Sequence, residues 1–375
     1  MKDLIERFTG YVKINTQSDE ESGTAPSSSG QQELAAELYS ELSGMGIRDV
    51  YYDREHCYVY AMIPGDDVKI GFIAHMDTSP EVSGENINPV TVREKSGLEI
   101  IKSDGTTLLG ADDKAGIAEI MYMAQYLSEH PEERHHTVSI AFTPDEEIGS
   151  GTDYFDLKKF GADFAYTVDG GGLGELEYES FNAAEAKIKI HGKNTHPGSA
   201  KDIMKNAIDI ACEFQGMLPA GEKPQYTEGR EGFFHVEMIR GNVEETEMIM
   251  IIRDHGRDKF EDRKKMVADN VQKLNQKYGS GTVEADINDQ YYNMGEIMKD
   301  HMDVVERAVN AMQESGVKPE IKPIRGGTDG AVLSFRGLPT PNLCTGGYLY
   351  HSRDEYAVIS EMRQCAEILI SLARS

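Results

Sequence analysis

Five short apolar runs in this chain each lead into a carboxylate or an imidazole. The runs cover residues 70–74, 108–111, 138–142, 164–168 and 348–350, and the polar side chains that follow are His75, Asp112, Glu146 with Glu147, Asp169 and His351. Short runs of this kind are typical of buried strands. Because the carboxyl ends of parallel strands meet at one edge of an open α/β sheet, groups from distant parts of the sequence can converge there. The pattern predicts an α/β fold with a hydrolytic site that holds two metal ions.

The order of expected elements divides the chain into a split domain and an inserted one. In the first part, helices and strands alternate, which predicts a mixed, mostly parallel sheet. We expect helices over 2–14, 31–45 and 113–129, and strands over 48–53, 57–63 and 69–74 and up to 142 and 168. A helix over 300–315 and a last helix over 357–373 continue this domain. We therefore assign residues 1–180 and 294–375 to a catalytic domain.

The inserted domain covers residues 181–293. Its first strand, over 183–191, alternates small or apolar residues with polar ones, which is typical of a strand with one face in water. A helix over 201–216, strands over 232–240 and 247–253, a helix over 257–278 and a strand over 281–288 follow. These elements predict a small α+β domain.

Composition limits the partners that such a protein can have. The chain holds 65 acidic and 38 basic residues, and the net charge of -27 argues against nucleic acid and anionic membranes. No apolar stretch approaches the ~18 residues of a membrane span. The four cysteines are far apart and form no CxxC pair, so we expect reduced thiols in a cytoplasmic protein. The first residues start an amphipathic helix and lack the apolar run of a signal peptide.

The polar positions differ in the chemistry that they can supply. In His75-x-Asp77 the Asp can hydrogen-bond the second ring nitrogen of a metal-bound His and fix its tautomer. Asp112 stands where a helix begins, so it can be either an N-cap or a carboxylate that bridges two cations. Asp113 or Lys114 would then cap or position that turn.

The adjacent carboxylates Glu146 and Glu147 point in different directions, so one can bind metal while the other takes a proton. Asp169 precedes three glycines, where the backbone must pass close to something. His196 lies in a rigid Asn-Thr-His-Pro-Gly turn. Such a His is either structural or, if it faces a cleft between domains, able to stabilise an oxyanion.

Taken in order along the chain, these motifs resemble those of the M20 family of di-zinc metallopeptidases, and within it the tripeptide aminopeptidases. The matching stretches are residues 74–80 (AHMDTSP), 109–119 (LGADDKAGIAE), 141–147 (AFTPDEE), 166–172 (YTVDGGG), 196–198 (HPG), 323–330 (PIRGGTDG) and 350–351 (YH). The resemblance spans nearly the whole chain and implies a zinc-exopeptidase-like catalytic domain with an inserted, ferredoxin-like lid domain.

The resemblance also implies roles for individual residues. His75 and Asp169 would hold one zinc, Glu147 and His351 the other, and Asp112 would bridge the two. Glu146 would be the general base and acid, Asp77 would orient His75, and His196 would reach the substrate carbonyl. The residues that match the lining of the peptide-binding cleft are Arg253, Arg325, Thr328 and Asp329. Two zinc ions per subunit are implied, with manganese or cobalt as alternatives, as is a homodimer formed through the lid domain.

Three segments depart from the family pattern. The segment 89–103 before the Asp-Asp-Lys motif is shorter than in the tripeptide aminopeptidases. After His351 the family usually reads Gly-Lys-His-Glu-Phe, whereas residues 352–356 are Ser-Arg-Asp-Glu-Tyr. The family's Arg-Asp-His/Phe-Asp run is Arg-Asp-His-Gly at residues 253–256. These changes bear on substrate length rather than on metal binding.

We therefore expect a metal-dependent aminopeptidase that removes the N-terminal residue from short peptides such as tripeptides. Two alternatives stay open: an amidohydrolase of this family that acts on dipeptides or N-acyl amino acids, and a metal-stabilised peptide-binding protein without turnover. A peptidase that selects short peptides needs a cation for the substrate's terminal carboxylate, and the planar fork of Arg suits this role. We favour Arg253 over Arg325, because a lid residue couples length selection to closure.

Overall fold

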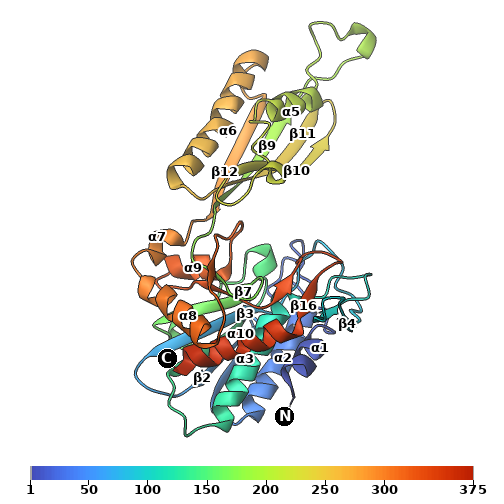
Figure 1. Cartoon of the computed structure of the whole chain (residues 1–375). Coiled ribbons are helices and arrows are strands. Elements are labelled where there is room, and N and C mark those ends of the chain that lie inside the picture. Colours follow the sequence, from blue (N-terminus) through green and yellow to red (C-terminus); the bar gives the residue numbers. More distant parts are fainter. Residues whose placement is uncertain (1, 375) are drawn as a thin grey trace. The chain divides into compact units, whose positions relative to one another are not determined.

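The computed structural model describes residues 2–374, which form two compact units (Figure 1). The first unit contains the chain up to Tyr178, Met294–Lys322 and the chain from Thr328 onward. The second contains Glu179–Asn293 and the short segment Pro323–Gly327. The expected insert, 181–293, lies within this second unit. No helix within residues 2–374 has both the length and the apolar character that crossing a membrane requires.

The first unit is built on an eight-stranded sheet with the order β1-β2-β6-β3-β7-β14-β8-β13. Its centre, β6-β3-β7-β14, is parallel, and β1, β2 and β8 add antiparallel pairs. The strands are β1 (Asp49–Asp53), β2 (Tyr58–Ile63), β3 (Lys69–His75), β6 (Thr137–Thr143), β7 (Phe164–Gly170), β8 (Glu175–Glu177), β13 (Glu320–Ile321) and β14 (Asn342–Cys344). The prediction of an α/β fold with a mixed, mostly parallel sheet is confirmed.

Helices cover this sheet and bury its central strands. Every residue of β6 is buried, as expected for a strand with both faces covered. Helix α3 (Ala111–Glu129) contacts β3, β7, α1 (Leu4–Tyr11) and α10 (Ile359–Arg374), and Figure 1 labels it beside α10. The remaining helices are α2 (Ser29–Gly44), α4 (Leu157–Phe160), α7 (Gly295–Met298), α8 (Met302–Glu314) and α9 (Asp329–Phe335).

Two of the expected strands differ from what the structure contains. The run 108–111 is a buried loop rather than a strand, because Gly110 adopts a left-handed conformation with φ of 80°. The run 348–350 also ends early: its strand stops at Tyr348, since Leu349 and His351 have φ of 56° and 57°.

A small antiparallel sheet, which the sequence did not suggest, lies in the first unit. Its strand order is β15-β16-β5-β4. It combines the shortened segment with the residues that flank His351: β4 (Val90–Arg93), β5 (Glu99–Lys102), β15 (Gly347–Tyr348) and β16 (Tyr356–Val358).

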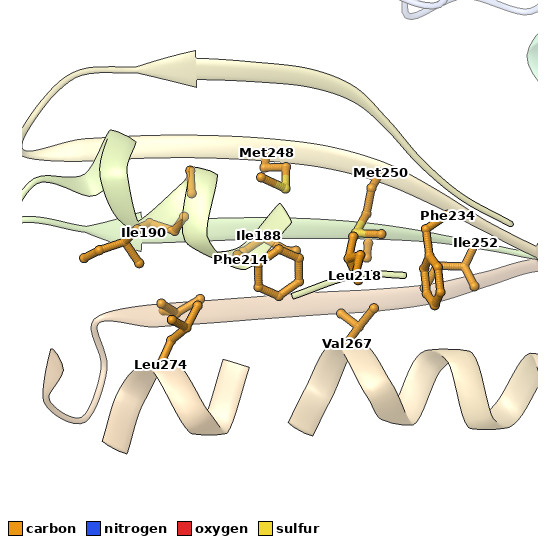
Figure 2. Packing of buried hydrophobic residues seen from close by; sticks show 14 of the residues in the cluster. Ile188, Ile190, Phe214, Leu218, Phe234, Met248, Met250, Ile252, Val267 and Leu274 are labelled. Atoms are coloured by element: carbon orange, nitrogen blue, oxygen red, sulfur yellow. The ribbon is translucent and has the colours of Figure 1, made fainter. Parts of the chain in front are cut away.

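The second unit is an antiparallel sheet with two helices packed on it, which agrees with the predicted α+β class. The strand order is β10-β11-β9-β12. The elements are β9 (Asn182–His191), α5 (Ala207–Gly216), β10 (Phe233–Gly241), β11 (Glu245–Asp254), α6 (Arg257–Tyr278) and β12 (Val283–Tyr291). Alternate residues of β9 and β11, such as Ile188 and Met250, face Phe214 and Val267 of the helices (Figure 2).

Helix α5 begins later than the pattern predicts. The Asn206 carboxamide oxygen accepts a hydrogen bond from the backbone N–H of Ile208 at 3.0 Å and caps the helix. The preceding turn, Pro197–Ser199, is a separate 3-10 helix.

Candidate metal centre

His75 ends β3 and is buried between three carboxylates. Its Nδ1 lies 3.2 Å from Asp77 Oδ1. Its Nε2 lies 2.9 Å from Asp112 Oδ1 and 3.4 Å from Asp169 Oδ1. One ring nitrogen therefore faces a buried Asp that can orient the ring, and the other faces two carboxylates that come from different elements.

His351 occupies an equivalent place beside Asp112. Its Nε2 lies 2.9 Å from Glu147 Oε2 and 3.3 Å from Asp112 Oδ2, and its Nδ1 lies 3.7 Å from Glu81 Oε2. The two oxygens of Asp112 thus face two different histidines, and this is the arrangement that a carboxylate bridging two cations requires.

Asp77 also holds the turn that carries the paired glutamates. Its Oδ1 accepts from the backbone N–H of Glu146 at 3.0 Å, and its Oδ2 accepts from that of Glu147 at 3.1 Å. Both lie in the 3-10 turn Glu146–Ile148, which follows β6. Asp77 therefore positions a candidate ligand, the candidate base and the His75 ring together.

Asp113 is close enough to be considered as a ligand. Two groups of side chains bring their ligand atoms within 4.8 Å of one another: His75 with Asp112 and Glu147, and His75 with Asp113 and Asp169. However, both Asp113 oxygens already accept backbone hydrogen bonds, from His75 N and Gly116 N, each at 3.2 Å. Asp113 is therefore better suited to anchoring the start of α3, as the sequence suggested, than to binding metal.

The carboxylates of this site carry more negative charge than the two histidines can balance. Burial raises the pKa of Glu147 to about 7, and it raises those of Glu146 and Asp169 well above their ordinary values. Burial also opposes the charged form of Asp112, but hydrogen bonds from His351 and His75 lower the pKa of its carboxyl. The carboxylates of Asp112 and Glu147 outweigh burial at His351 and raise its pKa to about 11.

These residues fit a divalent metal pair. Oε1 of Glu147 is buried and has no hydrogen-bond partner among residues 2–374. A buried polar oxygen without a partner is costly, and a cation would satisfy it. Imidazole nitrogens with carboxylate oxygens are a donor set that suits zinc, and also manganese or cobalt.

Two of the residues expected to bind substrate lie in the first unit. Asp329 begins α9, is buried, and its Oδ2 accepts a hydrogen bond from Thr143 Oγ1 at 2.7 Å. Burial raises the pKa of Asp329 to about 7, and its charge acts on Glu146. Thr328 precedes it, and its Oγ1 is buried without a partner in the described chain.

The other three lie in the second unit. His196 is exposed, and its Nδ1 accepts from the backbone N–H of Gly198 at 3.1 Å, so it caps the turn that it begins. Arg253 donates weakly from Nη1 to Ile252 O at 3.2 Å, and its guanidinium lies 5.4 Å from the centre of the Tyr291 ring.

Arg325 is more firmly held than Arg253. Its Nη1 donates to Gly229 O at 2.8 Å, and its Nη2 donates to Thr227 Oγ1 at 2.9 Å. The guanidinium also lies over the rings of Phe181 and Phe233. These contacts support a structural role within the second unit.

Sequence reasoning missed Glu355 altogether. Its carboxylate is buried and accepts backbone hydrogen bonds from the loop that leads to Asp112. The signal was present, because the family's run after the last His also contains a Glu, and this chain keeps it at residue 355.

Two of the three segments that depart from the family pattern meet in one place. A cavity of about 720 Å³ is lined by residues from 94–105 and 348–361, including Leu98, Lys102, Arg353 and Tyr356. None of the candidate metal ligands lines it. The shortened segment and the altered run after His351 therefore form a surface apart from the metal ligands.

Comparisons with known proteins identify the family of this chain. Residues 71–375 match the model of Peptidase family M20/M25/M40. The chain is 51% identical to Peptidase T of Geobacillus thermodenitrificans over 100% of this chain and 98% of that relative. It is 50% identical to Peptidase T of Clostridium acetobutylicum over 99% of this chain and 98% of the relative. That alignment runs over 402 positions although this chain has 375 residues, so the relative carries residues with no counterpart here.

Solved structures show the same fold. The crystal structure of aminopeptidase PepT from Bacillus cereus is 26% identical with a TM-score of 0.81, covering 99% of this chain and 97% of that one. A tripeptidase from Staphylococcus aureus, at 23% identity, has a TM-score of 0.84 with the same coverage. With a family match over most of its length and relatives at half identity across all of it, this chain belongs to peptidase family M20/M25/M40.

Proposed function

We propose that this protein is a metal-dependent aminopeptidase that removes the N-terminal residue from tripeptides. The observation that carries the proposal is the convergence of two imidazoles and two further carboxylates around Asp112, in a chain half identical to curated Peptidase T relatives. We assign His75 and Asp169 to one cation and Glu147 and His351 to the other, with Asp112 between them.

The proposed chemistry divides between the cations and the chain. When bound, two divalent cations polarise the scissile carbonyl and lower the pKa of an attacking water toward ~7. Glu146 takes the proton of that water at its carboxylate and later gives it to the leaving amine. Burial raises the pKa of Glu146, which favours a carboxyl able to hold the proton between these two steps.

The remaining residues position these groups. Asp77 hydrogen-bonds the ring of His75 and the backbone N–H of Glu146. It therefore holds the proposed proton acceptor, Glu146, at a fixed position relative to the imidazole. The imidazole of His196 is exposed and available to a substrate carbonyl. We propose that it stabilises the oxyanion that forms there. Arg253 is the proposed contact for the terminal carboxylate of the substrate.

Zinc is the metal that we propose, because two histidines with carboxylates form a typical zinc donor set. A cytoplasmic location is proposed on the basis of the four free cysteines, of which Cys344 and Cys365 have Sγ atoms 3.6 Å apart and yet are thiols.

We also propose a homodimer formed through the second unit. Strand β10 is an edge strand, and Ile239 on it and Ile208 on α5 are 42% and 40% exposed. An exposed edge strand with apolar side chains is a ready surface for pairing.

A substrate panel with metal analysis on the same sample tests the function. Zinc-loaded protein is assayed on free tripeptides, dipeptides, N-acetylated tripeptides and N-acetyl amino acids, before and after chelation. We expect cleavage of the first bond of free tripeptides, no cleavage of the acetylated ones, and recovery on adding zinc back. Faster cleavage of dipeptides or N-acetyl amino acids would replace the proposed substrate class, and full zinc occupancy without turnover would favour a binding protein.

A further inference from the structure

One buried carboxylate closes the loop that carries Asp112. Glu355 is 1% exposed. Its Oε2 accepts from the backbone N–H groups of Leu109 at 2.7 Å and Gly110 at 2.8 Å, and its Oε1 accepts from that of Asp112 at 3.1 Å. Three charge-assisted hydrogen bonds therefore end on a single side chain.

The loop needs these bonds because it has no strand partner. Residues 108–110 are buried but pair with no neighbouring strand, and Gly110 turns the chain through a left-handed conformation. Buried backbone N–H groups must find acceptors. Glu355 supplies acceptors for three of them, and without it the backbone of Asp112 would lose a direct anchor.

Glu355 also follows closely after His351. The same short segment therefore contains a proposed metal ligand and the anchor of a second one. The result is a fixed separation between Asp112 and His351, whose Oδ2 and Nε2 atoms lie 3.3 Å apart. This link joins residues that are 243 positions apart in the sequence.

We propose that Glu355 is a positioning residue of the metal centre, which holds Asp112 beside His351 so that both side chains can bind the same cation. The inference rests on the proposed role of Asp112 as the bridging ligand. Glu355 touches neither cation nor substrate in this proposal and acts through the backbone of the loop 109–112.

The chemistry of the bonds calls for a carboxylate. Two oxygens with free lone pairs can accept from three N–H groups, whereas the amide of Gln has one oxygen and an NH₂ group that would face a donor. The ammonium of Lys114, which is fully buried and donates to Ile14 O at 3.0 Å, attracts both Glu355 and Asp77.

The test is the zinc affinity of Glu355→Gln, measured by titration against a chelator, together with kcat and KM. We expect zinc to bind about 10- to 100-fold more weakly, the usual loss when a group that supports a metal ligand is removed. We expect kcat to fall while KM changes little. Glu355→Asp keeps the charge on a shorter side chain, so its zinc affinity should lie between those of the wild-type protein and Glu355→Gln.

A matched control separates positioning from stability. Asp254 is 2% exposed and accepts from Gly256 N at 2.9 Å and Arg263 Nε at 2.8 Å, within the second unit. Asp254→Asn should lower the unfolding midpoint and leave zinc affinity unchanged. If Glu355→Gln behaves in the same way, Glu355 is only structural and the proposal is wrong.

Asp112→Asn distinguishes this failure from failure of the ligand assignment. Wild-type zinc affinity in Asp112→Asn would overturn the proposed site itself. Weak zinc binding in Asp112→Asn with normal binding in Glu355→Gln would overturn only the inference about Glu355. If Glu355→Gln does not fold, Glu355→Asp decides, and wild-type zinc affinity in that variant overturns the inference.

Discussion

The two units of this molecule bury different kinds of side chain. In the first, several groups that ordinarily stay in water are fully buried, including Asp77, Asp113, Lys114 and Glu119. In the second, the main core cluster is apolar (Figure 2), and the buried carboxylate of Asp254 is paired with Arg263. Folding of the first unit therefore has to offset the desolvation of charge, whereas the second is stabilised by apolar packing.

The difference shows how a functional site changes the requirements of a fold. The long helix of each unit illustrates it: α3 buries Lys114 and Glu119 along with its apolar residues, whereas the buried residues of α6 are uncharged, namely Phe260, Val267, Asn270 and Leu274. Ion pairs on the second unit, such as Lys277 with Glu213, are partly exposed and contribute little. Bound cations should matter for the first unit and not for the second.

The largest expected effect is on catalysis in the first unit. Glu146→Gln removes the proton acceptor but leaves the ligands, so kcat should fall by about 10²- to 10⁴-fold while zinc content stays unchanged. Steady-state kinetics and metal analysis on the same preparation check this. Glu147→Gln is the contrasting control, since it should lose zinc. Near-full activity in Glu146→Gln would show that another group takes the proton.

The core of the second unit should respond to loss of packing alone. Phe214 is fully buried, and Phe214→Ala should lower the free energy of unfolding by about 3–5 kcal/mol. Zinc content of the folded protein should not change. Denaturant titration followed by metal analysis checks both, with Met266→Ala at a half-exposed position as the control. Loss of zinc in Phe214→Ala would mean that the two units do not fold independently.

His255 is a buried titratable group of the second unit and should make that unit sensitive to acid. Its ring is buried against Phe181, with ring centres 4.3 Å apart, and neither ring nitrogen has a hydrogen-bond partner in the described chain. Burial lowers its pKa to about 4, although the charges of Glu179 and Asp254 oppose the effect of burial, and those of Arg230 and Arg325 add to it.

The sign of this effect follows from the two pKa values. In the unfolded chain His255 binds a proton as the pH falls below its ordinary pKa of 6.5. In the folded protein it binds that proton only when the pH reaches about 4. Stability is therefore lost as the pH falls through this window, by up to roughly 3 kcal/mol. His255→Phe should remove this loss, and the difference in unfolding free energy between pH 7 and pH 4 measures it. An unchanged difference would show that His255 is protonated when folded.

The smallest expected effect concerns substrate binding. Arg253→Ala should raise KM for free-acid tripeptides roughly tenfold, as loss of one charge-assisted hydrogen bond would, and should spare amidated tripeptides. Arg240→Ala, on the neighbouring strand with a side chain that is 77% exposed, is the control. Equal losses on acids and amides would indicate that Arg253 does not contact the carboxylate.

The sequence predicted the elements with strong periodicity and the residues that they deliver. Helix α6 begins and ends as expected, and His75, Asp169 and the paired glutamates follow or end their predicted strands. The errors lie where one residue decides the backbone. Gly110 and Leu349 turn left-handed, so the run before Asp112 is a loop and the strand before His351 stops at Tyr348.

Long-range side-chain contacts were also beyond sequence reasoning. No periodicity links Glu355 to the loop 109–112 or Asp77 to the backbone of Glu146, because such bonds depend on how distant segments pack. His255 could not be placed for the same reason: its environment comes from residues far along the chain, such as Phe181 and Arg325.

The position of Asp77 has a consequence for anyone who wishes to redesign this centre. One carboxylate hydrogen-bonds both the imidazole of His75 and the turn that carries Glu146. A change in the position of this carboxylate would therefore move both groups together. A substitution at residue 77 therefore cannot be interpreted as a test of histidine orientation alone. Conversely, any attempt to retune the distance between metal and base must move the anchor itself, and that makes residue 77 the natural first choice for a library.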